Sequence, residues 1–169
     1  MRRRVLWSLP SGIYLIGSSG TFEGARRWNL MTANLVVQVS MDPKIIAASM
    51  EVGSLTRSLV RDSGAFSVSL IDRADRALVR RFVKPVSEVE LDADGAPTSM
   101  GGEGVLVAAT GSPILRRSPA WLDCSVVQEI ELGSHGLFLG EVVDASGSFE
   151  GDERLSVLRM EDTRMNYGG

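Results

Sequence analysis

The sequence predicts a mainly β fold, either a barrel or a sandwich, with a few short helices. Most segments alternate apolar and polar residues with a period of two, which is the pattern of half-buried strands. Strands do not alternate with helices along the chain, so a parallel sheet is not expected. The chain has 169 residues, of which 44% are hydrophobic and 23% charged, and this predicts a single globular domain over residues 1–169 with its own core.

The strand pattern is interrupted by turn signals. A loop rich in small and charged residues is expected over 19–27. Asp42-Pro43 is expected to join the second and third strands in a hairpin, and Gly133-Ser134-His135-Gly136 to connect the two long strands that flank it. The expected strands, in chain order, are 12–18, 34–40, 44–50, 65–71, 105–109, 122–132, 137–143 and 155–160.

Two segments are expected to be helical. Residues 54–63 carry apolar side chains at helical spacing, and Gly64 is the expected stop. Residues 72–82 repeat the pattern, with Pro85 just beyond. The Pro, Gly and acidic residues of 83–103 predict an excursion with little regular structure, which would serve as a lid or a dimer contact.

Charge and reactive side chains exclude several classes of function. The net charge of −3 gives no overall basic field that would attract nucleic acid. Cys124 and His135 are the only cysteine and the only histidine, which excludes a disulfide within the chain and any multi-cysteine or histidine-rich metal site. We expect no bound metal, a core position for Cys124, and, from spacing alone, an exposed hairpin position for His135.

The N-terminal segment and the hydropathy of the chain bear on its location. The first residues loosely resemble a signal peptide, but Ser8, Pro10 and Gly12 interrupt the apolar stretch and no cleavage site follows. The sequence contains no run of about 18 apolar residues, so no membrane-spanning helix is expected. A single cysteine suits a reducing compartment, so we expect a cytoplasmic protein with neither membrane nor nucleic-acid partners.

Two segments could hold a phosphorylated ligand. Gly53-Ser54-Leu55-Thr56 opens the first expected helix, where unpaired N–H groups and the helix dipole favour an anion, and Arg57 adds charge. The simpler interpretation is an ordinary N-cap. The segment Arg26–Asn34 mixes hydrogen-bond donors with small residues that let a planar ring approach the backbone. Its simpler interpretation is a loop in which Met31 fills the core.

Common nucleotide-binding and hydrolase motifs are absent from the sequence. No Gly-x-Gly-x-x-Gly follows an expected strand, and no P-loop is present. Gly101-Gly102-Glu103-Gly104 is expected to be only a flexible loop. No Gly-x-Ser-x-Gly elbow precedes a helix, so a serine hydrolase is not indicated. A bound nucleotide would therefore be held in some other way.

A series of short motifs runs through the chain in a fixed order. They are Asn29-Leu-Met-Thr-Ala-Asn34, Gln38-Val-Ser-Met-Asp-Pro43, Ser54-Leu55-Thr56, Asp62-Ser63-Gly64-Ala65-Phe66, Gly133-Ser134-His135, Gly140-Glu141-Val142 and the ending Met165-Asn166-Tyr167-Gly168-Gly169. Each motif is weak alone, but in this order and spacing they resemble the flavin reductase family, from about Ser11 to Gly169. The resemblance implies a Greek-key, FMN-binding split β-barrel.

The resemblance also implies a ligand and an assembly. It implies a homodimer that binds FMN, or FAD in its place, near the subunit interface and takes electrons from NADH or NADPH. Hydride would pass from the nicotinamide to the flavin beside His135, and since the cofactor supplies this chemistry no catalytic acid or base is expected. The residues that the resemblance assigns to the flavin are Asn29, Met31, Thr32, Ala33, Asn34, Ser49, Met50, Glu51, Ser54, Leu55, Thr56, Arg81 and Phe82.

The chain departs from the family pattern at two positions, and two functions stay open. Ser134 stands beside His135 where members usually carry Asp, which bears on NAD(P)H recognition. Glu51 lies near the expected phosphate, whose charge would then be met by Arg57, by Arg26–Arg27 or by a partner chain. The first function is a flavin reductase that supplies reduced flavin to a monooxygenase or another acceptor. The second is a non-catalytic FMN electron carrier that docks a redox partner.

Overall fold

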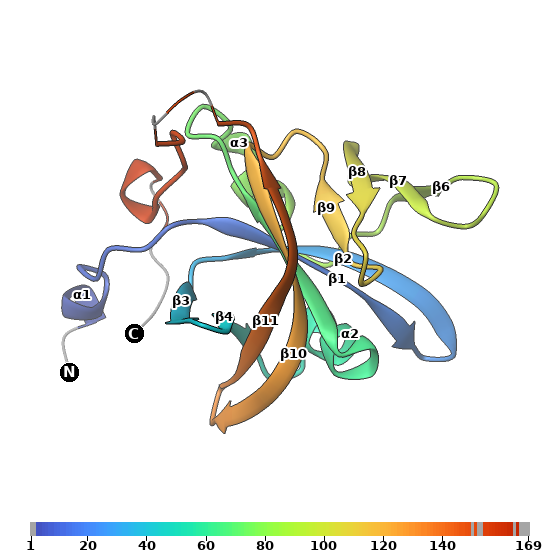
Figure 1. Ribbon diagram of the computed structural model, residues 1–169, viewed down its shortest axis with the longest axis horizontal. Coiled ribbons are helices and arrows are strands. Elements are labelled where there is room, and N and C mark those ends of the chain that lie inside the picture. The colour runs from blue at the N-terminus through green and yellow to red at the C-terminus, as the bar shows by residue number, and fades with distance from the viewer. Residues whose placement is uncertain (1–2, 150, 152–153, 164, 166–169) are drawn as a thin grey trace.

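A seven-stranded antiparallel sheet forms the body of the molecule (Figure 1). The computed structural model describes residues 3–149, 151, 154–163 and 165. The strands of this sheet are β1 (Tyr14–Phe22), β2 (Ala25–Ala33), β3 (Val36–Met41), β4 (Lys44–Glu51), β5 (Ala65–Leu70), β10 (Ala120–Leu132) and β11 (His135–Gly147). Their order, β2-β1-β5-β10-β11-β4-β3, is not sequential, and the mainly β fold predicted from the sequence is confirmed.

A smaller sheet and short helices complete the fold. In Figure 1 the small sheet lies on the opposite side of β10 and β11 from the β3–β4 hairpin. Its strands, in the order β6-β7-β8-β9, are β6 (Val89–Leu91), β7 (Pro97–Met100), β8 (Glu103–Val107) and β9 (Pro113–Leu115). The helices are α1 (Arg3–Leu6), α2 (Leu55–Ser63), α3 (Ala77–Arg81) and the 3-10 helix η1 (Met160–Asp162).

Strand β1 separates two hydrophobic clusters, because successive side chains of a strand point to opposite faces. Ile16 belongs to the cluster that contains Phe66, Cys124 and Phe138, whereas Leu15 belongs to the cluster built with α3 and the small sheet. The predicted core position of Cys124 is confirmed, since its side chain is fully buried. Burial, together with the charge of Asp123, raises the pKa of the Cys124 thiol to about 12.

Two glycines let neighbouring elements approach closely. A Cβ on Gly17 would lie 1.8 Å from the carbonyl oxygen of Pro113, so β9 can cross β1 only where β1 has no side chain. A Cβ on Gly140 would lie 2.6 Å from the ring of Phe66 and 2.8 Å from the Cβ of Cys124. The absence of a side chain there leaves room for the Phe66 ring in the core.

The helix expected over 54–63 is confirmed as α2, with both ends defined by local sequence. Ser54 is the N-cap, and its hydroxyl accepts a hydrogen bond from the Arg57 N–H at 3.2 Å. Gly64 adopts the left-handed conformation, with φ of 69°, and ends the helix. The Asp42-Pro43 and Gly133–Gly136 hairpins are confirmed as well, joining β3 to β4 and β10 to β11.

The prediction of a loop over residues 19–27 is wrong. Strand β1 continues to Phe22 and β2 begins at Ala25, so only a tight turn separates them. Ser18 and Ser19 are small and polar yet fully buried. Helix α2 lies so close to β1 that a Cβ on Gly20 would meet the Leu59 carbonyl oxygen at 2.8 Å. Small side chains therefore mark a covered strand here, not a loop.

Three other expectations are corrected. The helix expected over 72–82 shortens to α3, because Asp72 forms a turn by accepting from the Ala74 N–H. The segment 83–103 holds β6 and β7, so the expectation of little regular structure is wrong for those residues, and its role as a lid or dimer contact stays a prediction. Residues 155–160, which were expected to form a strand, form isolated bridges and the start of η1. Strand β9 was not expected from the sequence.

Candidate functional site

A pocket of about 150 Å³ opens at the end of β2, and we name it the flavin-motif pocket after the sequence motif that lines it. Its walls come from β2, β4, α3, the start of β11 and the segment around η1. The residues that line it are Ile13, Met31, Thr32, Ala33, Asn34, Leu35, Ser49, Glu51, Val79, Val83, His135, Met160 and Met165. Most of the central motif, two residues of β4 and the only histidine thus meet at one place.

The 29–34 motif was expected to be a loop, but most of it is the last part of the edge strand β2. An edge strand leaves backbone groups unpaired on its outer side. Thr32 uses them: its N–H donates to the Phe82 carbonyl at 2.9 Å, and its hydroxyl donates to the Val79 carbonyl at 2.8 Å. These two bonds attach α3 to β2 and fix one wall of the pocket.

Another part of the pocket lining is His135, at the β10–β11 turn. His135 starts β11 and pairs in register with Glu51 of β4. The Ser134 hydroxyl lies 2.9 Å from Nδ1 of His135, and the Val52 N–H donates to the Ser134 carbonyl at 2.9 Å. His135 is half-buried and lines the pocket, not the free hairpin surface that its spacing alone suggested. The serine that replaces the family's aspartate still contacts the imidazole.

Other predicted ligand residues lie behind the pocket. Asn29 is buried, and its amide donates to the Thr56 hydroxyl at 2.9 Å while its oxygen accepts from the Val86 N–H at 2.9 Å. This side chain ties β2 to α2 and to the segment after α3. The side chains of Met50 and Phe82 are fully buried in the two hydrophobic clusters. None of these side chains lines the flavin-motif pocket.

The start of α2, expected to hold a phosphate, does not line the pocket either. Ser54 acts as the N-cap described above, and Leu55 is half-buried beside it. Arg57, the expected source of positive charge, is only 8% exposed and bonds to Glu129 at 2.7 Å and to Glu131 at 3.2 Å. Its guanidinium is therefore already neutralised within the protein.

The remaining predicted cations also have partners or point elsewhere. Arg81 bonds to Glu103 at 2.5 Å and to the Gly101 carbonyl at 3.3 Å, which directs it toward the small sheet. Arg26 donates to the Ser19 hydroxyl and lies 5.6 Å from the centre of the Trp28 ring. Arg27 is exposed and lines neither pocket.

Sequence analysis missed the apolar walls of the pocket. Ile13, Leu35, Val79, Val83, Met160 and Met165 line it. Each is an ordinary apolar residue in a different segment, so only the tertiary arrangement identifies them. The ending 166–169, which resembled the family tail, lies outside the described residues.

A four-charge cluster braces α2 against β10. Arg57 and Arg61 on the helix both bond to Glu129 and Glu131 on the strand. Burial raises the pKa of the Glu129 carboxyl, but the hydrogen bonds and charges of Arg61 and Arg57 outweigh this, and its pKa lies below the ordinary value. Glu129 is therefore ionised at neutral pH and compensates the nearly buried Arg57.

Replacing Glu129 with glutamine is expected to lower the free energy of unfolding by about 2 kcal/mol near neutral pH, because Arg57 then loses its main counter-charge. Its contribution is present above the unfolded-state pKa of about 4.5 and is lost as the pH falls through the lowered folded-state pKa. Urea unfolding of wild type and variant across this acid range measures the difference.

The matched control is Glu131→Gln, which removes a carboxylate of the same cluster that is 74% exposed. Its expected effect is below about 0.5 kcal/mol. A Glu129→Gln deficit that stayed constant into strong acid would show that lost packing, not lost charge, weakens the variant.

Two features are absent from the residues that the structure describes. No helix among them is long and apolar enough to cross a lipid bilayer. No group of three or more His, Cys, Asp or Glu side chains among them is placed to hold a metal ion.

Comparison with known proteins identifies the family. The family model described as "Flavin reductase like domain" matches residues 6–165. The ferric-chelate reductase (NAD(P)H) of Archaeoglobus fulgidus is 30% identical over 141 residues, which cover 82% of this chain and 77% of that protein. The high molecular weight rubredoxin of Moorella thermoacetica is 29% identical over 90% of this chain, which spans 62% of that longer protein.

A solved structure supports the same conclusion at the level of fold. The NADH:FAD oxidoreductase SgcE6 of Streptomyces globisporus C-1027 superposes with a TM-score of 0.70 at 23% identity, covering 85% of this chain and 80% of that one. The predicted mainly β fold is thereby confirmed as one that this oxidoreductase shares. With its motifs in family order, a family match over 6–165 and the same strand arrangement, the chain belongs to the flavin reductase like domain family.

Proposed function

We propose that this protein is an NAD(P)H-dependent flavin oxidoreductase that binds FMN at the flavin-motif pocket. One observation carries the proposal: residues Met31–Asn34 and His135, which lie far apart in sequence, line the same pocket. The family match and relatives named as reductases support the same chemistry. The single domain over residues 1–169 is part of the proposal.

The residues of the pocket suit a flavin. Ala33 and Ser49 are small and let a planar ring approach, Asn34 offers a side-chain amide, and Leu35 and Val83 add apolar surface. When bound, FMN would accept a hydride from the nicotinamide donor. The chain would bind and orient the ring through Met31–Asn34, Ser49 and Glu51.

Residues outside the pocket keep a proposed role in the flavin site. We place the phosphate at the start of α2, at Ser54, Leu55 and Thr56. The N–H groups of Leu55 and Thr56 belong to the first turn, whose N–H groups lack partners within the helix. Ser54 would contribute its hydroxyl, since its N–H donates to the Glu51 carbonyl at 3.2 Å. Asn29, Met50, Arg81 and Phe82 would act from behind, by fixing the backbone around the ring.

His135 is proposed to orient the nicotinamide donor. It lines the pocket, and the Ser134 hydroxyl lies within hydrogen-bonding distance of its Nδ1. Such a residue need not be a strong acid, because hydride transfer requires the donor ring to be correctly positioned against the flavin and does not require a proton from the protein. His135 therefore acts as a binding residue for the donor.

The size of the pocket supports a homodimer. A volume of about 150 Å³ is below the roughly 300–1,000 Å³ typical of ligand pockets, so one chain encloses only part of a flavin. Next to Leu35, the edge strand β3 exposes Val37, Val39 and Met41, the last at 83%. We propose that a second copy covers this strip and completes the site.

Location and acceptor complete the proposal. We propose a cytoplasmic protein that hands reduced flavin to a monooxygenase or another acceptor. A ferric iron acceptor is supported by the relative named as a ferric-chelate reductase. FMN is proposed over FAD as the bound flavin, with either nicotinamide dinucleotide as the donor.

The test is a flavin titration followed by NADH and NADPH oxidation. Wild-type protein is expected to bind FMN, to gain thermal stability from it, and to oxidise a nicotinamide donor faster than free flavin does. Colourless protein whose melting temperature ignores added FMN would overturn the proposal.

Replacing His135 with alanine is expected to raise the KM for the nicotinamide donor roughly tenfold and to change the dissociation constant of FMN by less than about threefold. The reason is that His135 would contact the donor while Met31–Asn34 hold the flavin. Steady-state kinetics and FMN fluorescence titration measure the two effects separately. The control is Ser125→Ala, an exposed position on β10 that lines neither pocket.

A second candidate is a non-catalytic FMN electron carrier that docks a redox partner. Two observations favour it: Ser134 replaces the aspartate expected beside His135, and one relative is named a rubredoxin. A carrier would hold FMN tightly and show no nicotinamide turnover. Unchanged donor oxidation in His135→Ala would instead remove His135 from the donor site and would count against the carrier, because the protein would still turn over the nicotinamide donor.

A further inference from the structure

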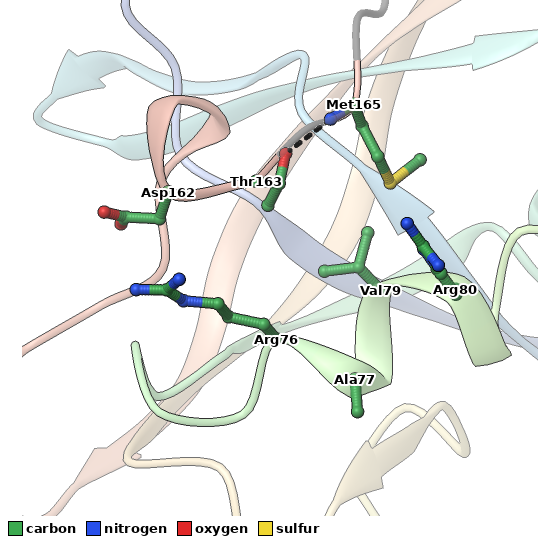
Figure 2. A pocket seen from close by; sticks show the side chains of 7 residues that line it. All are labelled: Arg76, Ala77, Val79, Arg80, Asp162, Thr163 and Met165. Carbon is green, nitrogen blue, oxygen red and sulfur yellow. Dashed lines mark hydrogen bonds between the residues drawn. The ribbon is translucent and has the colours of Figure 1, made fainter.

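A second and larger pocket adjoins the flavin-motif pocket (Figure 2). It is open and has a volume of about 430 Å³. Helix α3 and the residue before it form one side, and Asp162, Thr163 and Met165 form the other. Val79 and Met165 line both pockets, so the two spaces meet at these side chains. We name this space the arginine pocket, after Arg76 and Arg80 on its wall.

The arginine pocket carries two cations, Arg76 and Arg80, on one wall. Arg76 and Arg80 lie four residues apart, about one helical turn. In Figure 2 the Arg76 guanidinium lies on the Asp162 side and that of Arg80 on the Met165 side. Neither guanidinium makes a hydrogen bond or ion pair with any residue that the structure describes.

The carboxylate of the pocket does not cancel this charge. One oxygen of Asp162 accepts from Arg73, and the other accepts from the Arg159 N–H at 3.0 Å. Burial raises the pKa of Asp162, but these bonds and the nearby charges of Arg73 and Arg76 outweigh it, and its pKa is lowered. Asp162 is thus ionised but already paired with Arg73.

The other arginines around α3 give a contrast. Arg73 pairs with Asp162, Arg81 with Glu103, and Arg117 with both Asp75 and Glu103. Among the described residues, Arg76 and Arg80 form no such ion pair, although the charge of Arg76 acts on Asp162. Two unpaired guanidinium groups on one wall of an open pocket are suited to phosphate oxygens.

We propose that the arginine pocket binds the phosphates of the adenylate half of a dinucleotide, whose redox ring lies in the flavin-motif pocket. The inference rests on the proposed function. A dinucleotide is long enough to need both spaces, and Val79 and Met165 mark where it passes between them. Ala77, Val79 and Met165 supply apolar surface for the adenine. The phosphates come either from FAD or from NADH or NADPH.

The test compares four ligands on one double variant. Dissociation constants of FMN, FAD, NADH and NADPH are measured by titration for wild type and for Arg76→Ala/Arg80→Ala. At least one dinucleotide is expected to bind about tenfold more weakly to the variant, with a smaller effect at high salt, while FMN changes less than about twofold. Lys84→Ala is the matched control, since it removes one nearby exposed positive charge and lines neither pocket.

The ligand that weakens identifies the source of the phosphates. Loss for FAD alone assigns the pocket to the flavin dinucleotide. Loss for NADH and NADPH assigns it to the donor, and a larger loss for NADPH adds the 2′-phosphate as a contact. Thermal unfolding checks that the variant is folded, as expected for two exposed arginines.

Three results would overturn the inference. If the Arg76→Ala/Arg80→Ala variant binds FMN and every dinucleotide as tightly as wild type does, the inference is wrong and the proposed function is unaffected. Equal weakening of FMN and FAD means that the pocket holds the FMN phosphate instead. If wild-type protein binds none of the four ligands, both the proposed function and the role of the arginine pocket are wrong. If it binds NADPH through Arg76 and Arg80 but does not bind FMN, the proposed flavin site is wrong and the role of the arginine pocket stands.

Discussion

Gly17→Ala is expected to lower the free energy of unfolding by about 3 kcal/mol or more, or to leave the protein insoluble. The new methyl group would lie 1.8 Å from the Pro113 carbonyl oxygen and 2.3 Å from the Ser67 hydroxyl. Ser67 already donates to that carbonyl at 2.6 Å, so neither atom can move without losing the bond. The strands β1 and β9 would have to separate, which disturbs both hydrophobic clusters.

Urea unfolding monitored by tryptophan fluorescence measures the effect. Gly104→Ala is the matched control, because a Cβ there meets nothing closer than 3.5 Å, at the Arg116 Nε, and needs no positive φ. It is expected to change stability by less than about 1 kcal/mol. Equal stability of the two variants would mean that β9 does not press against β1 at this point.

Asn29→Ala is expected to cost about 2–4 kcal/mol of folding free energy and to weaken FMN binding as a consequence. The amide of Asn29 bonds to the Thr56 hydroxyl and to the Val86 N–H in a buried position. Truncation leaves the Val86 N–H without its partner and opens a cavity. Because Asn29 joins β2, α2 and the segment after α3, the wall of the flavin-motif pocket would loosen.

The design separates a supporting role from a direct ligand contact. Asn34→Ala is the comparison, since Asn34 lines the pocket and, among the described residues, its side chain makes one long hydrogen bond, in which its amide donates to the Ser11 hydroxyl at 3.5 Å. Asn34→Ala is expected to weaken FMN binding with little loss of stability in the ligand-free protein. Asn29→Ala should show the stability loss before any flavin is added. If its ligand-free stability were normal, Asn29 would have to contact the flavin itself.

The sequence predicted those parts of the fold that depend on local signals. Helix α2 was placed because Ser54 and Gly64 cap it, and the long hairpin because its strands alternate around Gly133. The β1–β2 hairpin was missed, since its buried positions at Ser18 and Ser19 are polar and its partner elements are distant in sequence. Short strands such as β9 form because the tertiary fold places a pairing strand beside them, and no local sequence pattern predicts them.

The site was predicted in part for a similar reason. A motif identifies residues near a ligand, but not whether a side chain faces the ligand or the core. Thr32 and Asn34 face the pocket, whereas Asn29 and Met50 face inward. Arg57 looked like a phosphate ligand until β10 supplied Glu129 as its partner. Pairings of this kind depend on strand register, which no short motif encodes.

The flavin-motif pocket draws its walls from nearly the whole length of the chain, from Ile13 to Met165. Translation proceeds at roughly 5–20 residues per second from the N-terminus, so these walls cannot all exist until Met165 has been made and folded back. Both hydrophobic clusters are built from side chains of the chain itself. The flavin proposed for this pocket would therefore bind after the chain has folded, and a cell short of flavin would accumulate folded protein that can still take it up.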